Sequence, residues 1–131
     1  MAWDGTCAQL LQDRPSLSCL AFYEKGTGTV YGATNEEMKT PEVSKTMLSL
    51  CDTIKGSQAM TSFSFLGSKF IVLRKDEDCL LAKSGKKVCY VYLCEKLILV
   101  GVSEDTEAKM NAGAANQAMD SLCKYYKSIN Y

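Results

Sequence analysis

The sequence contains no histidine, has only two prolines among its 131 residues, and carries no excess of charge of either sign. Without histidine, the chain cannot use a Cys–His or Ser–His–Asp arrangement, a histidine-ligated metal or a histidine pH switch. Fifteen Lys and Arg balance fifteen Asp and Glu, which argues against a bulk electrostatic partner such as nucleic acid. These absences disfavour several common classes of catalytic and nucleic-acid-binding protein, and nothing in the sequence implies a catalytic residue, a metal or a cofactor.

Long apolar runs are also missing. The most apolar stretches, residues 88–94 and 97–102, are far too short to span a bilayer and are separated by Glu95 and Lys96. The first residues lack the basic region and long apolar run of a signal peptide. We therefore expect a cytoplasmic protein.

Cysteine, in contrast, is abundant, with seven residues and no C-x-x-C pair. This odd number favours buried thiols that act as small apolar side chains in a reducing compartment. Disulfides and thiolate zinc are the alternatives. None of the seven is marked as an activated thiol, so a cysteine-dependent redox enzyme is the weakest functional hypothesis.

Length and composition fit a single domain over residues 1–131. Hydrophobic periodicity predicts helices over residues 3–11 and 40–54 and a closing helix from about residue 111 to residue 129. It also predicts strands over residues 17–23 and 29–33 and about five more between residues 60 and 103, with a turn at Gly67 and Ser68. Because short turns join consecutive strands, we expect an α/β protein of the α+β type with a central antiparallel sheet covered by helices.

Two patterns could mark binding surfaces. Residues 69–96 carry seven basic side chains against four acidic ones, and several could project from one outer face of the sheet. The alternative is that these cations merely solvate the strands. Aromatic residues gather at the two chain ends, with Trp3 at one and Tyr125, Tyr126 and Tyr131 at the other. If the terminal helices pack side by side, these rings form a shelf suited to a proline-rich ligand. Ordinary packing of a helix on the sheet is the alternative, above all for Tyr126.

The glycine-rich segment 26–32 leads into a predicted strand, whereas a phosphate-binding loop opens a helix. We therefore interpret it as a hairpin turn.

The order of elements and several short motifs together resemble the profilin family over essentially the whole chain. The most specific motif is Gly-x-Lys-aromatic-x-Val-aliphatic-Arg at residues 67–74, and the second is the helix start Asn-Ala-Gly-Ala-Ala-Asn-Gln at residues 111–117. Trp3 and the Val-Tyr-Gly-Ala strand at residues 30–33 fit the same order. The resemblance is to a divergent, compact member. It implies six to seven strands, with the N- and C-terminal helices on one face of the sheet and a further helix on the other.

Profilins are non-enzymatic, monomeric proteins of the cytoplasm and cytoskeleton that bind actin monomers, regulate actin polymerisation and bind proline-rich segments. Carried over by position, the resemblance implies an actin-binding face at Lys69, Arg74, Lys83, Asn111, Gly113, Asn116 and Gln117. It implies a polyproline groove at Trp3, Tyr31, Tyr125, Tyr126 and Tyr131. Many profilins also bind phosphoinositides, and the lysines at one turn, Lys83, Lys86 and Lys87, are the candidates for that site.

The chain departs from the family pattern at several of these positions. Thr6 stands where an aromatic residue is usual, Tyr31 where many members have tryptophan, and Asn111 and Gln117 where histidine and lysine are frequent. A trafficking scaffold of the longin or roadblock type, which would not bind actin, is the alternative function.

Lys69 and Arg74 pose a geometric problem for a shared surface. They are five residues apart, so simple alternation along a strand would place them on opposite faces of the sheet. A bend or bulge between them, or a position at the strand's end, is needed to bring both to one surface.

Overall fold

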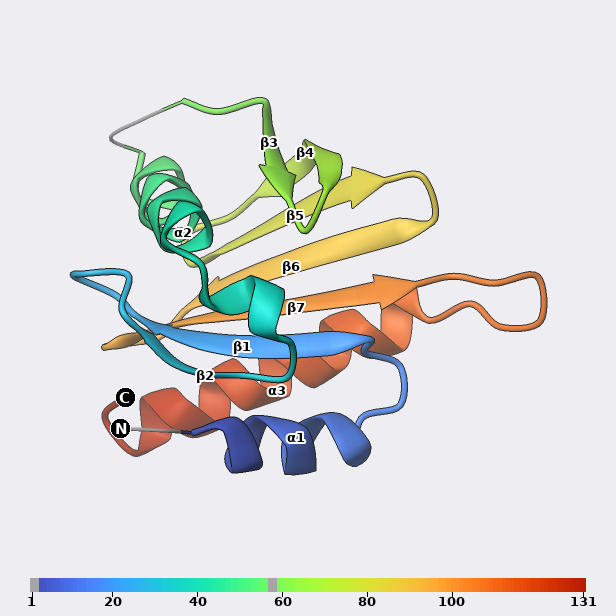
Figure 1. Cartoon of the computed structure of the whole chain (residues 1–131), viewed down its shortest axis with the longest axis horizontal. Coiled ribbons are helices and arrows are strands. Elements are labelled where there is room, and N and C mark those ends of the chain that lie inside the picture. Colours follow the sequence, from blue (N-terminus) through green and yellow to red (C-terminus); the bar gives the residue numbers. More distant parts are fainter. Residues whose placement is uncertain (1–2, 57–58) are drawn as a thin grey trace.

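In the computed structural model, which describes residues 3–56 and 59–131, the chain forms a curled seven-stranded sheet with three α-helices and one short 3₁₀ helix (Figure 1). The elements are α1 (Asp4–Gln12), β1 (Cys19–Glu24), β2 (Val30–Ala33), η1 (Glu36–Lys39), α2 (Pro41–Ile54), β3 (Ser62–Phe65), β4 (Ser68–Lys75), β5 (Cys79–Ser84), β6 (Lys87–Leu93), β7 (Leu97–Glu104) and α3 (Ala112–Ser128).

The sheet order is β2-β1-β7-β6-β5-β4-β3, and every neighbouring pair is antiparallel. Helices α1 and α3 lie side by side on one face, and α2 lies on the other (Figure 1). The predicted α+β architecture is therefore confirmed. None of the helices in the described part of the chain is long and apolar enough to cross a membrane.

Two hydrophobic cores fill the spaces between these layers. One packs α2 against the sheet, and the other packs α1 and α3 against the opposite face. Strands β6 and β7 lie in the middle of the sheet and are buried on both faces along most of their length. This position explains why the two most apolar runs in the sequence show little alternation.

The helix patterns predicted from the sequence match the buried faces. In α2, Thr40 Oγ1 accepts a hydrogen bond from the Val43 backbone N–H at 3.3 Å, and Pro41 occupies the first turn. The apolar residues of α2 at helical spacing are all buried: Val43, Met47, Leu50, Cys51 and Ile54. In α3 the residues at this spacing are buried at Met119, Leu122 and Tyr126.

Three local features differ from the prediction. Ile129 is 44% exposed, because α3 ends at Ser128. The helix η1 was not predicted, since four residues are too few to show a helical period. The β3–β4 hairpin turns at Leu66 and Gly67, both at positive φ, so Ser68 already belongs to β4.

Candidate binding surfaces

The aromatic residues of the two chain ends meet in one place. The ring centroid of Trp3 lies 5.5 Å from that of Tyr31, 5.4 Å from that of Tyr131, and 6.2 Å from that of Tyr126 in a stacked arrangement. Tyr125 extends the group, with its ring centroid 5.1 Å from that of Tyr126. These five residues are called the terminal aromatic cluster below, and the expectation that the structure brings them together is confirmed.

Backbone contacts hold the chain ends in this arrangement. The Trp3 N–H donates to the Tyr31 carbonyl at 2.7 Å, and the Tyr131 N–H donates to the Tyr126 carbonyl at 2.8 Å. The Tyr131 carbonyl accepts from the N–H groups of Lys96 and Leu97, which follow β6. Neither end depends on side-chain packing alone to stay in position.

The members of the cluster differ in exposure. Tyr125 is 57% exposed, whereas Tyr126 is only 6% exposed and packs edge-on against Phe22 of the core at 5.2 Å. Trp3, Tyr31 and Tyr131 are half-buried. Tyr126 therefore packs into the core and supports the more exposed rings of the cluster. This agrees with the alternative that Tyr126 packs its helix on the sheet.

A polar contact fixes the Tyr31 ring. Its hydroxyl donates to Glu24 Oε2 at 2.7 Å, and this hydrogen bond raises the pKa of Tyr31 and lowers the pKa of Glu24. Because Glu24 ends β1 and Tyr31 lies near the start of β2, the contact holds the ring beside the turn of the β1–β2 hairpin. An oriented ring with its hydroxyl already engaged presents its flat apolar side to a ligand.

A β-bulge resolves the geometric problem of Lys69 and Arg74. In the pairing of β4 with β5, Ile71 is opposite Lys83, Val72 is opposite Ala82, and Arg74 is opposite Leu81, so Leu73 is the extra residue. Alternation places Lys69 on the same side as Ile71, and the bulge returns Arg74 to that side. Both basic residues therefore lie on one face of the sheet, which a shared binding surface requires.

The resulting surface, called the β4–β5 face, lies on the side of the sheet that carries α3 but beyond the cover of that helix. It combines basic and apolar side chains: Lys69, Ile71, Leu73, Arg74, Leu81 and Lys83. Ile71 is 57% exposed and Leu73 is 62% exposed. Arg74 Nε lies 3.2 Å from Asp76 Oδ2, an exposed ion pair at the strand's end.

The sequence analysis missed Ile71 and Leu73 as candidate binding residues. Alternation with the buried Phe70 could have identified Ile71 as exposed. The same alternation places Leu73 on the side of Ile71, and only the position of Arg74 depends on the bulge.

Helix α3 carries the other residues that the resemblance assigns to the actin-binding face. Asn116 lies on the side of α3 that faces β6, where its Oδ1 accepts a hydrogen bond from the Tyr92 hydroxyl at 2.6 Å. Gly113, one turn earlier, is exposed, and a Cβ added there would meet no atom within 4 Å.

Asn111 and Gln117, which the resemblance also assigns to the actin-binding face, border a hollow at the other side of α3. This open hollow lies between the start of α3 and residues 13–16, which follow α1. The Asn111 Nδ2 group donates to the Glu104 carbonyl at 2.9 Å, so this side chain ties α3 to the end of β7. Asp105 Oδ1 caps the helix by accepting from the N–H groups of Asn111 and Ala112.

The three lysines of the expected phosphoinositide site do not project to one side. Lys83 is opposite Val88 and shares its side of the sheet, which carries α3. Lys87 has the same parity as Cys89 and therefore points to the opposite side, which carries α2. Lys86 lies in the turn between β5 and β6. Strand alternation thus separates residues that are close in sequence.

All seven cysteines are buried free thiols. Burial raises the pKa of Cys7 to about 12 and the pKa of Cys19 to about 11. The Cys94 thiol lies 3.6 Å from Cys123 and donates to it, which raises the pKa of Cys94 and lowers that of Cys123. The expectation of buried thiols acting as small apolar side chains is confirmed.

A sequence model of the profilin family matches residues 1–131. Among solved structures, profilin IB of Acanthamoeba castellanii is 21% identical with a TM-score of 0.83, and the match covers 98% of this chain and 99% of that one. A Schizosaccharomyces pombe profilin is 18% identical with a TM-score of 0.80 over 98% and 99% of the two chains. LokiProfilin2, in a complex with rabbit actin, is 14% identical with a TM-score of 0.68 over 95% and 94%. A search of curated protein sequences found no match.

Proposed function

The chain belongs to the profilin family, and from that premise we propose that it binds monomeric actin through the β4–β5 face and proline-rich segments through the terminal aromatic cluster. It would thereby limit spontaneous nucleation of filaments and deliver actin subunits to assembly factors that carry proline-rich segments.

The observation that carries the actin proposal is the bulge at Leu73. It returns Arg74 to the side of Lys69 and Lys83, so that the three cations surround the exposed side chains of Ile71 and Leu73 on a part of the sheet that α3 leaves uncovered. An apolar centre with a charged rim is the usual composition of a protein interface, and the cations suit the acidic surface of actin. LokiProfilin2, which has the same fold, was solved in a complex with rabbit actin.

The proline proposal rests on the meeting of five aromatic rings at the chain ends. A polyproline helix is already extended before it binds, so it loses little conformational freedom against a flat aromatic surface. Tyr125 and Trp3 offer accessible ring area, and Tyr126 supports them from below. The two surfaces use different elements, so one protein molecule can hold actin and a proline-rich segment together.

Charge reversal on the β4–β5 face tests the actin proposal. We expect Lys69→Glu with Arg74→Glu to weaken actin binding at least about tenfold and to slow association, because like charges replace complementary ones at the rim. Binding to purified actin monomers is measured by sedimentation, and nucleation by the lag before filament growth. The double variant Lys45→Glu with Lys55→Glu makes the same change in net charge at two exposed positions across the sheet, one on α2 and one directly after it, and should retain actin binding.

Polyproline binding by the double variant Lys69→Glu with Arg74→Glu separates the two proposed surfaces. This binding should remain at the parental affinity, since no member of the aromatic cluster is altered. Parental actin affinity in a folded double variant, or a joint loss of both activities, would show that the actin surface is placed wrongly.

Trp3, the only tryptophan, tests the proline surface. Its fluorescence should change when a proline-rich peptide stacks across it, and Trp3→Ala should weaken peptide binding by about 1 kcal/mol or more, as expected for an aromatic anchor. Circular dichroism checks that the variant is folded, because Trp3 also contacts Phe22. A folded Trp3→Ala protein with parental peptide affinity would contradict the assignment.

A further inference from the structure

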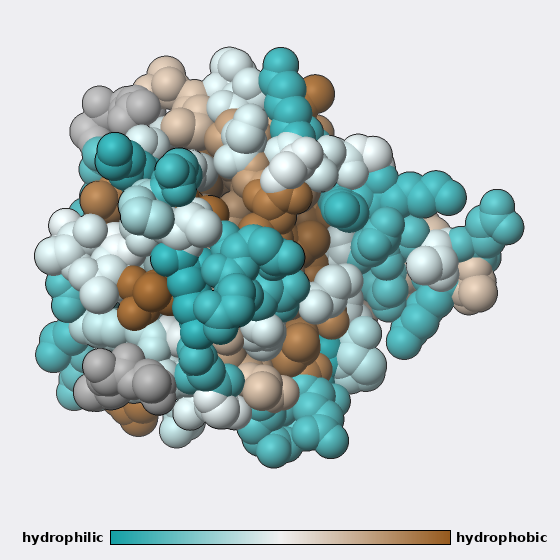
Figure 2. Space-filling model, viewed as in Figure 1, coloured by the Kyte–Doolittle hydropathy of each residue, from teal (hydrophilic) through white to brown (hydrophobic). Residues whose placement is uncertain are grey.

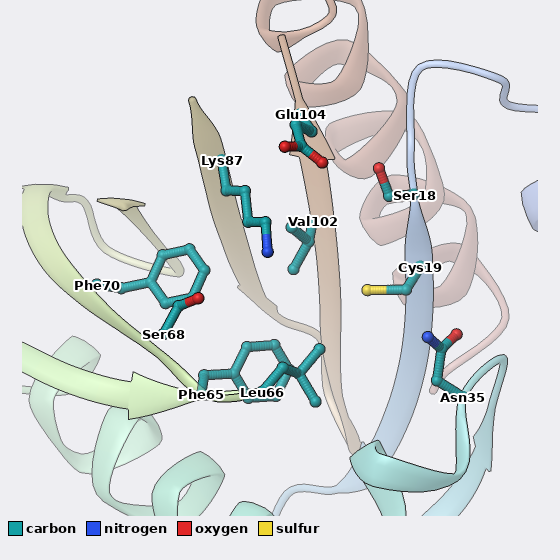
Figure 3. A pocket seen from close by; sticks show the side chains of 10 residues that line it. All are labelled: Ser18, Cys19, Asn35, Phe65, Leu66, Ser68, Phe70, Lys87, Val102 and Glu104. Atoms are coloured by element: carbon teal, nitrogen blue, oxygen red, sulfur yellow. The ribbon is translucent and has the colours of Figure 1, made fainter. Parts of the chain in front are cut away.

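A hollow on the opposite side of the sheet from the β4–β5 face is not used by the proposed function. It lies between the β3–β4 hairpin and strands β1, β6 and β7, where α2 does not cover the sheet (Figure 3). The space-filling view shows apolar surface in this region, bordered by hydrophilic residues (Figure 2). This pocket is called the hairpin hollow below.

The floor and walls of the hairpin hollow are apolar. Cys19, Phe65, Phe70 and Val102 line it, and each is a buried residue of the core on that side of the sheet. Its volume is about 170 Å³. An apolar cavity of roughly 150 Å³ admits a benzene molecule, so the hollow has room for one six-membered ring beside the two phenylalanines, whose own ring centroids lie 6.2 Å apart.

A single cation points into this apolar space. Lys87 starts β6 and is paired in register with Glu104, yet its side chain extends toward Val102 and away from the Glu104 carboxylate (Figure 3). In the described part of the chain, the Lys87 ammonium forms no ion pair. A half-buried ammonium against apolar walls is stabilised by a bound anion, because the anion restores the electrostatic interaction that partial loss of water removes.

Polar groups at the mouth complete the site. The Ser18 and Ser68 hydroxyls and the Asn35 amide border the opening and can donate hydrogen bonds to an oxygen anion. One lysine with a carboxylate nearby suits a monoanion better than a phosphate ester, whose higher charge Glu104 would repel. From this combination we propose that the hairpin hollow binds a small aromatic carboxylate, with the ring against Phe65 and Phe70 and the carboxylate on Lys87.

Benzoate and its neutral analogue benzamide are the probes that test this site, titrated into the full chain with backbone amide shifts as the readout. We expect benzoate to shift the resonances of Cys19, Val102 and the β3–β4 hairpin with a dissociation constant of about 1 mM or lower. Benzamide should bind at least about tenfold more weakly, because it cannot form the charge-assisted contact with Lys87.

Two lysine variants complete the test. Lys87→Met keeps most of the side-chain stem but removes the charge, and it should abolish the preference for benzoate over benzamide. Lys86→Met, at the neighbouring exposed position, is the matched control and should bind both probes like the parent. The assignment is overturned if benzoate shifts none of these resonances, if both probes bind the parent equally, or if folded Lys87→Met retains the benzoate preference.

Discussion

At the scale of single residues, the contact between Gly32 and Trp3 has the strictest geometric requirement in the terminal aromatic cluster. A Cβ added to Gly32 would lie 2.5 Å from the Trp3 carbonyl carbon and 2.7 Å from its oxygen. Because the Trp3 N–H is bonded to the Tyr31 carbonyl, the backbone at Trp3 cannot shift without losing that bond. The absence of a side chain at position 32 therefore lets the N-terminal segment cross β2 closely enough to place the Trp3 ring.

We expect Gly32→Ala to lower the free energy of unfolding by about 1–3 kcal/mol, as overpacking usually does, and to weaken binding of proline-rich peptides as well. Chemical denaturation and peptide titration measure the two effects. Gly5→Ala in α1 is the matched control, because a Cβ there meets no atom within 4 Å and alanine favours a helix. Equal stability of Gly32→Ala and the parent would contradict the close contact described here.

At the scale of elements, the attachment of α1 depends on one carboxylate. Asp4 Oδ1 accepts from the Ala33 N–H at 3.0 Å, and Oδ2 accepts from Lys39 Nζ at 2.6 Å. The start of α1 is thereby joined to the end of β2 and to η1. The hydrogen bond from Lys39, and then that from Ala33, lower the pKa of Asp4.

A lowered pKa gives the stability contribution of Asp4 a definite pH dependence. The folded protein binds a proton at Asp4 less readily than the unfolded chain, so the contribution is present above the ordinary carboxyl pKa of 3.8 and is lost as pH falls through the lower folded value. We expect Asp4→Asn to be less stable than the parent near neutral pH and to converge with it as the solution is acidified. Urea denaturation over this pH range measures the difference.

Asp13→Asn is the control for this prediction, since Asp13 lies at the other end of α1 and its side chain accepts a weak hydrogen bond from Gln9, at 3.4 Å. It separates the loss of the Asp4 contacts from the general effect of removing one negative charge. A stability difference between Asp4→Asn and the parent that stays constant as pH falls below 4 would contradict the assignment.

At the scale of the whole molecule, charge is distributed by face although the net charge is zero. Lys69, Arg74 and Lys83 belong to the β4–β5 face, while Lys87 lies across the sheet. Each lysine near an anionic membrane surface contributes about 1 kcal/mol to binding. Phosphoinositide vesicles should therefore meet the same face that we assign to actin.

We expect vesicles that contain phosphoinositide to compete with actin for the protein, and Lys83→Gln to weaken vesicle binding more than Lys87→Gln. Co-sedimentation with vesicles of phosphatidylcholine, with and without phosphoinositide, measures this. Equal binding to both kinds of vesicle, or binding to neither, would show that the protein does not recognise phosphoinositide.

The sequence by itself determined the elements and their order. The stripe Val43, Met47, Leu50, Cys51 and Ile54 predicted the buried face of α2, and turn residues such as Gly67 and Gly85 separated the strands of the hairpins. These features follow from periods of 2 and 3.6 residues and from local backbone preferences, which act within a few positions of the chain. The motifs at residues 67–74 and 111–117 were also enough to indicate the family, which the match over residues 1–131 confirms.

Only the tertiary structure decided which side chains share a surface. The partner strand β5 sets the register that makes Leu73 a bulge, and this register brings Lys69 and Arg74 together. The packing of α1 beside α3 brings Trp3 to Tyr131 from opposite ends of the chain. The curl of the sheet sets Phe65 and Phe70 opposite Val102 to form the hairpin hollow. Each of these depends on contacts between distant segments, which local periodicity does not encode.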